Sequence, residues 1–183
     1  KARQEHKTLK REAKRTGKAL EIVKTVALKT QQQLEYHVSS VVTNAQEAVF
    51  DDPYGLVIEF VERRGKTECD IWFERDDNRY NPIAGTGIGA VDVAAFALRV
   101  ASWSLDKSTR NCLMLDEPFR HIKGQMANRR ALEMVQQVSY ELGLQIIVVS
   151  DERAPREDIV AAADKVFEVS KAGNSSQVRE VPK

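Results

Sequence analysis

The sequence predicts an α/β fold in which a parallel sheet is flanked by helices, preceded by a β-hairpin and a long helix. Three observations support this. Strand-like and helix-like segments alternate between residues 85 and 169, which favours a parallel sheet. Before them lie two segments that alternate apolar and polar residues, as the strands of a hairpin do. The first 50 residues contain no proline and a single glycine, Gly17, as expected of a long helix.

The long helix carries an apolar stripe whose steps of three, four and seven residues are typical of a coiled-coil strand. The stripe consists of Leu9, Ala13, Leu20, Val23, Ala27, Leu34, Val38, Val41, Ala45 and Val49. A helix of this length exceeds the usual ~8–20 residues of globular proteins, so we expect part of it to project. We therefore assign residues 1–50 to the base of a coiled coil.

The start of this helix is basic. Residues 1–24 contain nine Lys or Arg and three Glu, which suggests an anionic partner such as DNA. The candidate DNA-binding residues are Lys10, Arg11, Lys14 and Arg15. A solvated helix face is the alternative interpretation of the same charges.

The hairpin is predicted from Leu56–Val61 and Glu68–Phe73, followed by a polar loop over residues 74–82. Its turn contains Gly-Lys-Thr at residues 65–67, three residues that also occur in phosphate-binding loops. Phe60 stands where such a loop needs its first glycine, so we interpret the segment as a turn and not as a phosphate site.

The remaining elements follow in order. Residues 85–89 form a glycine-rich loop, and a helix rich in small residues runs on to about Leu105. A strand over 112–115, a helix over about 127–142 that Gly143 stops, and a strand over 145–149 suited to a buried parallel sheet come next. Pro155 opens a short helix, and residues 165–169 form the last strand. We assign residues 51–172 to one lobe and residues 173–183 to a flexible tail.

The strongest chemical signal is the run Leu-Met-Leu-Asp-Glu-Pro-Phe at residues 113–119. Open α/β sheets bind ligands at the carboxyl ends of their strands, and Asp116 and Glu117 follow a strand there. Asp116 can hold Mg²⁺, and Glu117 can orient or deprotonate an attacking water. Taken alone, the pair also fits an acidic turn after a strand.

These motifs, in this order, resemble the C-terminal lobe of SMC, RecF and SbcC-type ATP-binding-cassette ATPases. The resemblance covers residues 56–169, and the long helix matches the family's returning coiled-coil strand. It is greatest to phage-encoded members, whose glycine-rich signature runs into a helix like Val-Asp-Val-Ala-Ala-Phe-Ala-Leu-Arg at residues 91–99.

The resemblance implies an ATPase that uses ATP and Mg²⁺ in DNA repair, recombination or chromosome maintenance. Asp116 would belong to the Walker B motif and Glu117 would be the catalytic glutamate. Thr86, Gly87 and Gly89 would form the signature loop, which faces ATP bound to the opposite subunit of a head-to-head homodimer. An N-terminal lobe that carries the Walker A motif, DNA, and a nuclease subunit are the implied partners.

The chain departs from the family in three places. It contains no Walker A motif, Thr86 and Ile88 alter the usual Ser-Gly-Gly signature, and Asp151 stands where the family has its switch histidine. A carboxylate near a γ-phosphate is repelled unless a cation compensates. Two alternatives therefore stay open: a non-catalytic module of this fold that dimerises or holds DNA, or an ATPase of another pathway such as transport.

Composition limits the location of the protein. The 183 residues are 42% hydrophobic and 30% charged, which suits a domain with a core. The apolar runs fall short of the ~18 residues of a membrane span and no signal peptide is visible, so we expect no membrane partner. Two cysteines suggest no disulfide framework, and we expect a reducing cytoplasm, that of the host if the protein is phage-encoded. Since Lys1 comes first, the sequence leaves open whether the chain is a fragment.

Overall fold

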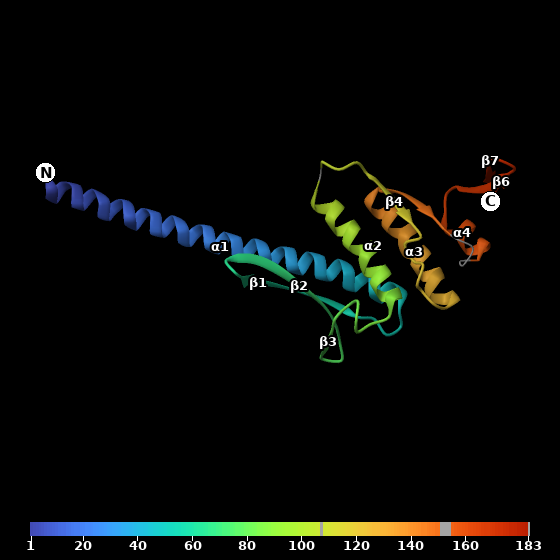
Figure 1. Ribbon diagram of the computed structural model, residues 1–183, viewed down its shortest axis with the longest axis horizontal. Helices are drawn as coiled ribbons and strands as arrows, with labels where there is room; N and C mark the ends of the chain where they lie inside the picture. The colour runs from blue at the N-terminus through green and yellow to red at the C-terminus, as the bar shows by residue number, and fades with distance from the viewer. Residues whose placement is uncertain (107, 151–154, 183) are drawn as a thin grey trace.

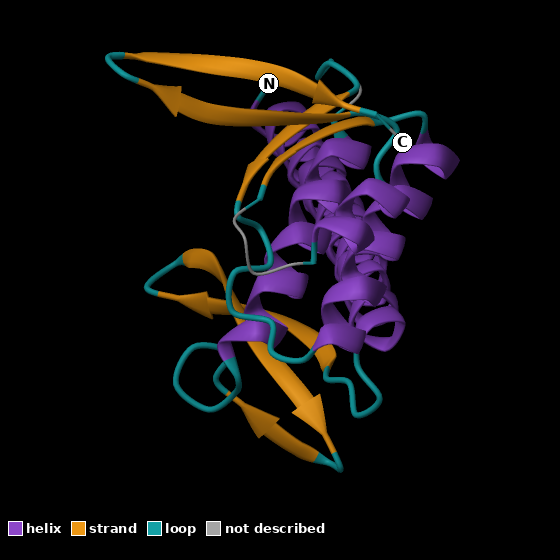
Figure 2. Cartoon of the chain, turned by 90° about the vertical axis from the view of Figure 1, so that its right-hand side faces the viewer, coloured by secondary structure: helices purple, strands orange, loops and turns teal. Residues whose placement is uncertain are grey.

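The computed structural model describes residues 1–106, 108–150 and 155–182. A single helix, α1 (Ala2–Val49), projects from a mixed α/β body (Figure 1). Viewed along α1, the helices gather together and the strands lie to one side of them (Figure 2). The α/β class expected from the sequence is confirmed.

Helix α1 has two parts with different surroundings. All side chains over residues 1–30 are exposed, whereas Val42, Gln46 and Val49 near its C-terminal end are fully buried. The apolar stripe therefore continues into the protein core at one end and remains uncovered at the other. The long helix predicted from the stripe is confirmed, and its last turns are part of the core of the body.

An antiparallel sheet packs against α1 and α2. It contains β1 (Gly55–Arg63), β2 (Lys66–Arg75) and β3 (Asn78–Tyr80). The predicted hairpin is confirmed: Arg64 and Gly65 have φ of 53° and 72°, and Arg63 pairs with Lys66. The strand β3 lies in the segment expected to be a loop, because Asp76 and Asp77 adopt positive φ and form a second tight turn.

Helix α2 (Ile88–Leu105) lies between two apolar clusters. Its buried residues pack against the β1–β2 sheet on one side and against α3 (Gln125–Leu142) and β4 on the other; they are Ala90, Val93, Ala94, Phe96, Ala97, Val100 and Ala101. By length and composition alone α2 is apolar enough to span a membrane. Its packing in the core accounts for that composition, as for the central helix of a soluble domain.

The parallel pair consists of β4 (Cys112–Asp116) and β5 (Gln145–Val149), in a register that places Asp116 opposite Val149. One face of the pair contributes Leu113, Leu115, Ile146 and Val148 to the core beneath α3. The other face is open, and Met114, Ile147 and Val149 are 78%, 44% and 57% exposed. The sequence predicts that β5 is buried, and the structure buries one of its two faces.

The C-terminal region contains a short helix, α4 (Arg156–Ala162), with Pro155 as its N-cap, and a hairpin. Strand β6 (Val166–Ala172) pairs antiparallel with β7 (Ser175–Val181), and Gly173 in the turn has a φ of 62°. The expectation of a flexible tail over residues 173–183 is therefore wrong for β7. Backbone pairing with β6 orders a segment whose polar composition gives little hydrophobic signal.

Candidate functional site

The two carboxylates follow β4 at the carboxyl end of the parallel pair. Asp116 ends the strand and is exposed. The backbone N–H of Glu117 donates to the Val149 carbonyl oxygen at 2.9 Å, which extends the pairing of the two strands by one hydrogen bond. Glu117 has a φ of 41°, a left-handed conformation that is costly for a residue with a side chain and is found disproportionately at functional sites.

The side chain of Glu117 is partly open to solvent. It is 34% exposed, and Arg120 Nη1 lies 3.6 Å from one of its oxygens. This separation is longer than that of a strong charge-assisted hydrogen bond, so the carboxylate remains able to accept another proton donor. Asp116 and Glu117 are thus neighbours in a sheet-end position that is suited to binding a cation and activating a water.

The glycine-rich loop precedes α2 and is stabilised by side-chain and backbone hydrogen bonds within residues 81–86. Asn81 Oδ1 accepts hydrogen bonds from the N–H groups of Ile83 and Ala84, each at 3.0 Å, and the Asn81 carbonyl accepts one from Gly85 at 2.8 Å. The hydroxyl of Thr86 donates to the carbonyl oxygen of Pro82 at 2.6 Å. In this conformation the Thr86 hydroxyl hydrogen is engaged within the loop.

Gly87 and Gly89 are glycines in two different situations. A Cβ at Gly89 would lie 3.0 Å from the carbonyl oxygen of His121 and 3.2 Å from Cα of Ile122. A Cβ at Gly87 would meet no heavy atom within 4 Å, and Gly87 has an ordinary φ of −70°. Packing among the described residues therefore favours a glycine at position 89 and places no such demand on position 87.

The N-terminus of α2 offers donors to an anion. Gly87 is the N-cap and supplies no side-chain cap, so the first N–H groups of the helix lack intrahelical acceptors. Together with the helix dipole, such a terminus favours phosphate groups. This is the property that the sequence analysis assigned to Thr86, Gly87 and Gly89.

The candidate metal ligand is Asp116, with Glu117 beside it as the candidate catalytic glutamate. Within residues 1–106, 108–150 and 155–182, no group of three or more His, Cys, Asp or Glu side chains could hold a metal ion by itself. Mg²⁺ in nucleotide sites typically takes one or two carboxylates plus phosphate oxygens and waters. An exposed Asp116 fits that donor set. Asp151, the predicted switch position, lies outside the described residues.

One contact in this region is missed by sequence reasoning. Asp92 on α2 contacts His121 in the segment after Glu117, with the His121 N–H at 2.8 Å and Nδ1 at 3.2 Å from Asp92 Oδ2. The His121 side chain is 47% exposed and is also a partner of Asp92. The sequence signal for this contact is the spacing of Gly89, Asp92 and Phe96, which places all three residues on one face of a helix.

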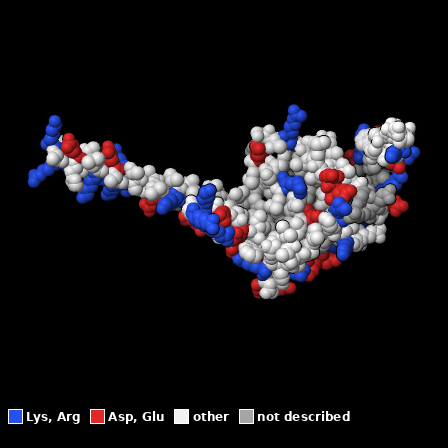
Figure 3. Space-filling model, in the orientation of Figure 1, with Lys and Arg blue, Asp and Glu red and all other residues white. Residues whose placement is uncertain are grey.

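The candidate DNA-binding residues lie far from the carboxylates. Lys10, Arg11, Lys14 and Arg15 are exposed on the projecting part of α1, where Lys and Arg outnumber acidic side chains (Figure 3). The figure also shows acidic side chains interspersed along the helix. The basic, projecting part of α1 therefore lies apart from Asp116 and Glu117.

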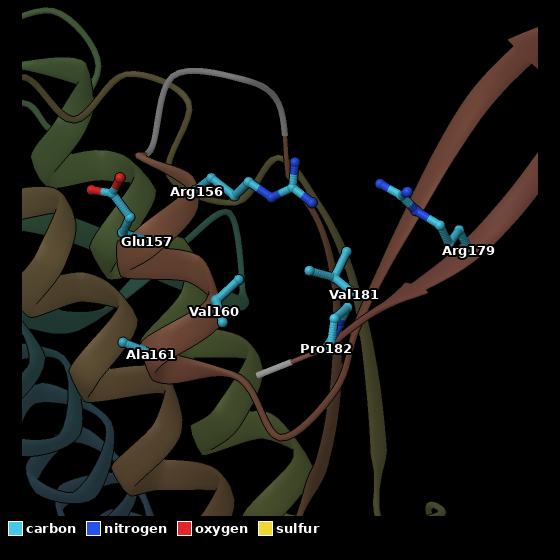
Figure 4. Close-up of a pocket in the computed structure, with 7 residues that line it drawn as sticks. All are labelled: Arg156, Glu157, Val160, Ala161, Arg179, Val181 and Pro182. Atoms are coloured by element: carbon cyan, nitrogen blue, oxygen red, sulfur yellow. The ribbon is translucent and has the colours of Figure 1, made fainter.

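A hollow of about 670 Å³ lies between α4 and β7, and is lined by Arg156, Glu157, Val160, Ala161, Arg179, Val181 and Pro182 (Figure 4). Both arginines of this lining pair with Glu168. Its Oε2 lies 2.9 Å from Arg179 Nη2 and 3.3 Å from Arg156 Nη2. The hydrogen bond from Arg179 and the charge of Arg156 lower the pKa of the Glu168 carboxyl. None of the predicted site residues lines this hollow.

The chain is similar to proteins of known sequence and structure. It is 34% identical over 118 residues to the DNA double-strand break repair Rad50 ATPase of Saccharolobus solfataricus. That match covers 64% of this chain and 13% of the relative, so the chain corresponds to a small part of that protein. No family model matches the sequence.

Solved structures match over most of the chain. One, from work on ATP-driven dimerization and DNA-stimulated activation of SMC ATPases, has a TM-score of 0.64 at 18% identity and covers 87% of this chain and 89% of its own. The Smc head domain of Pyrococcus furiosus with an extended coiled coil, solved with the C-terminal domain of ScpA, also has a TM-score of 0.64 at 18% identity, covering 86% of this chain and 37% of its own. The fold is that of an SMC head.

Proposed function

We propose that this chain, an SMC/Rad50-type ATPase head lobe, completes an ATP-hydrolysing site together with a second lobe that carries the Walker A motif. The observation that carries the proposal is the position of Asp116 and Glu117. The parallel pair presents both carboxylates at its carboxyl end, which is where α/β sheets hold their ligands.

The proposed roles follow from the geometry of the two side chains. Asp116, as the Walker B aspartate, would hold Mg²⁺ directly or through water, and the ion supplies charge neutralisation to the phosphates when bound. Glu117 would accept the proton of the attacking water or orient it. Its backbone has the left-handed φ of 41°, and its side chain is 34% exposed with Arg120 Nη1 3.6 Å from one oxygen.

The open face of the parallel pair supports a missing lobe. Parallel sheets are normally covered on both faces, yet Met114, Ile147 and Val149 are exposed on this one. Among residues 1–106, 108–150 and 155–182 this sheet contains two strands, so both of its edges carry unpaired backbone groups. A Walker A lobe that adds strands would pair these backbone groups and would also cover the exposed face.

The glycine-rich loop supports a site shared between subunits. No described residue limits the side chain at Gly87, so we attribute a requirement for glycine there to a group outside the described residues. A phosphate held at the N-terminus of α2 needs such a close approach of backbone. We place the ATP of the opposite subunit of a head-to-head homodimer at Thr86, Gly87 and Gly89.

The process proposed is DNA repair, recombination or chromosome maintenance. The Saccharolobus relative is a DNA double-strand break repair ATPase, and an exposed basic helix is suited to binding DNA phosphates without sequence preference. A nuclease subunit, SbcC-like organisation and a phage origin are parts of the same proposal that rest on the sequence resemblance.

One observation favours the non-catalytic alternative. The hydroxyl of Thr86 donates to Pro82 within the loop, so in this conformation it does not present its hydrogen to a phosphate. A module that dimerises or holds DNA without turnover would need no such contact. ATP turnover by the two-lobe head is the measurement that separates the two functions.

The test compares this chain alone with the head that contains the Walker A lobe. We expect the complete head to hydrolyse ATP in the presence of Mg²⁺ and the chain alone to show no appreciable turnover. Turnover by the chain alone would contradict the placement of the phosphate-binding loop elsewhere. A complete head that binds ATP and associates without hydrolysing it would establish the non-catalytic module instead.

A further inference from the structure

One face of α2 contacts the segment that begins at Glu117. We name residues 117–124 the carboxylate loop. Gly89, Asp92 and Phe96, which share that face, each contact the loop. The backbone of the loop lies so close to Gly89 that a Cβ there would be 3.0 Å from the His121 carbonyl oxygen, and Phe96 meets Phe119 edge to face with ring centroids 5.6 Å apart.

Asp92 makes the polar contact among the three. Its carboxylate accepts from the backbone N–H of His121 at 2.8 Å and lies 3.2 and 3.3 Å from His121 Nδ1. The Asp92 side chain is 17% exposed, so water competes little for these contacts. Hydrogen bonds to an ionised carboxylate are stronger than neutral ones, and a bond to the backbone fixes the loop itself.

Hydrogen bonds within the carboxylate loop connect His121, which Asp92 holds, to Glu117. The Arg120 N–H donates to the Glu117 carbonyl at 3.2 Å, and the Ile122 N–H donates to the Phe119 carbonyl at 3.1 Å. These two tight turns leave few free dihedral angles between His121 and Glu117. At the other end, Asn128 Nδ2 donates to the Ile122 carbonyl at 3.2 Å. The loop is therefore held along its length.

We propose that Asp92 is a positioning residue that couples the glycine-rich loop at the start of α2 to the carboxylate of Glu117. The inference rests on the proposed function. In the proposed dimer the glycine-rich loop and Glu117 of one chain serve two different ATP molecules, so Asp92 connects the two sites. Ligand binding at the first turn of α2 displaces the carboxylate loop because close packing and the Asp92 bonds join them.

The first experiment measures the contact without nucleotide. Amide hydrogen exchange of the two-lobe head is compared for the parent, Asp92→Ala and Asp92→Asn. We expect Asp92→Ala to speed exchange at His121 about tenfold or more. Asp92→Asn keeps an oxygen acceptor and should have a smaller effect. Unchanged exchange at His121 in Asp92→Ala would overturn the inference whatever the ATPase does.

The matched control is Asp51→Asn. It also removes a carboxylate that pairs with a side chain on a distant element, since Asp51 accepts from Arg130 at 2.6 Å, but it lies outside the proposed site. We expect Asp51→Asn to leave exchange at His121 and the turnover number unchanged. If Asp51→Asn and Asp92→Ala have equal effects on turnover, Asp92 has a general structural role and the coupling is wrong.

The second experiment separates association from hydrolysis. In Asp92→Ala we expect ATP to bring heads together at concentrations within about threefold of the parent, while kcat falls about tenfold and KM changes little. Asp92→Asn should recover most of kcat. Loss of association in proportion to kcat would overturn the inference. If the parent head itself does not hydrolyse ATP, the proposed function fails and the coupling with it, and the exchange result still reports the contact.

Discussion

Gln46 donates from Nε2 to the carbonyl oxygen of Ala90 over 2.6 Å and so joins α1 to the first turn of α2. The side chain of Gln46 is fully buried, and its Oε1 has no hydrogen-bond partner among the described residues. A buried oxygen without a donor costs about 1–3 kcal/mol. The bond therefore fixes the projecting helix to the glycine-rich end of α2 at a cost in stability.

This arrangement predicts different changes in the free energy of unfolding for two substitutions of Gln46. Gln46→Ala should destabilise the protein by about 2–4 kcal/mol, because it leaves a cavity and removes the bond. Gln46→Met keeps the volume and removes the unsatisfied oxygen, so it should stay within about 1 kcal/mol of the parent. Urea unfolding measures both. Equal losses for Ala and Met would mean that the hydrogen bond, and not the volume, matters at this position.

The two glycines around the start of α2 should respond differently to alanine. Gly89→Ala should destabilise by about 1–3 kcal/mol, since the new methyl group would overlap the backbone of the carboxylate loop. Gly87→Ala should change the free energy of unfolding by less than about 1 kcal/mol, because the site is open. Thermal unfolding of the pair tests this. A stable Gly89→Ala variant would show that the loop shifts freely away from α2.

Gly87→Arg tests the shared ATP site. The side chain has room within the chain, so folding and ATP binding to the separate head should be retained. The bulk would prevent the backbone from approaching a phosphate on the opposite subunit. We expect ATP to drive association of parent heads in light scattering and not of Gly87→Arg heads. Normal ATP-driven association of the variant would mean that the glycines form a hinge and not a signature.

Glu117→Gln tests the role of the glutamate in the complete head. The amide keeps the shape of the side chain but cannot accept a proton, so Mg-ATP should bind while hydrolysis falls about 10²–10⁴-fold. Asp116→Asn should mainly weaken the dependence on Mg²⁺. Glu133→Gln is the control, because Glu133 is an exposed glutamate that pairs with Arg129 on α3. Turnover of Glu117→Gln within about threefold of the parent would exclude the assigned role.

DNA binding by α1 should depend steeply on salt. Each phosphate neutralised on duplex DNA contributes about −0.9 to the slope of log affinity against log salt concentration. Replacing Lys10, Arg11, Lys14 and Arg15 with glutamine should flatten that slope and weaken binding for all sequences alike. Replacing Lys165, which precedes β6, and Lys171 and Arg179 on the β6–β7 hairpin is the control. Unchanged slope and affinity after the α1 replacements would mean that these charges are only a solvated helix face.

Strong local patterns determined much of the fold. The apolar stripe of α1, the hairpin around Arg64 and Gly65, the strand before Asp116 and the helix stop at Gly143 are set by periodicity and backbone preference, which act within a few residues. Positive φ at Gly143 and its place as the C-cap of α3 illustrate this. The order of these elements also predicted the fold, which is that of an SMC head.

Tertiary structure alone decided the rest. Strand β7 is ordered by pairing with β6, and its own polar sequence gives little sign of it. The contact of Asp92 with His121 joins residues 29 positions apart, and Gln46 reaches Ala90 across 44 positions. Sequence periodicity reports which face of an element is apolar, but not which distant backbone comes to lie against it. The sequence thus determined the two carboxylates and the glycine-rich loop, whereas packing of α2 between two clusters determined that the segment after Glu117 lies against α2.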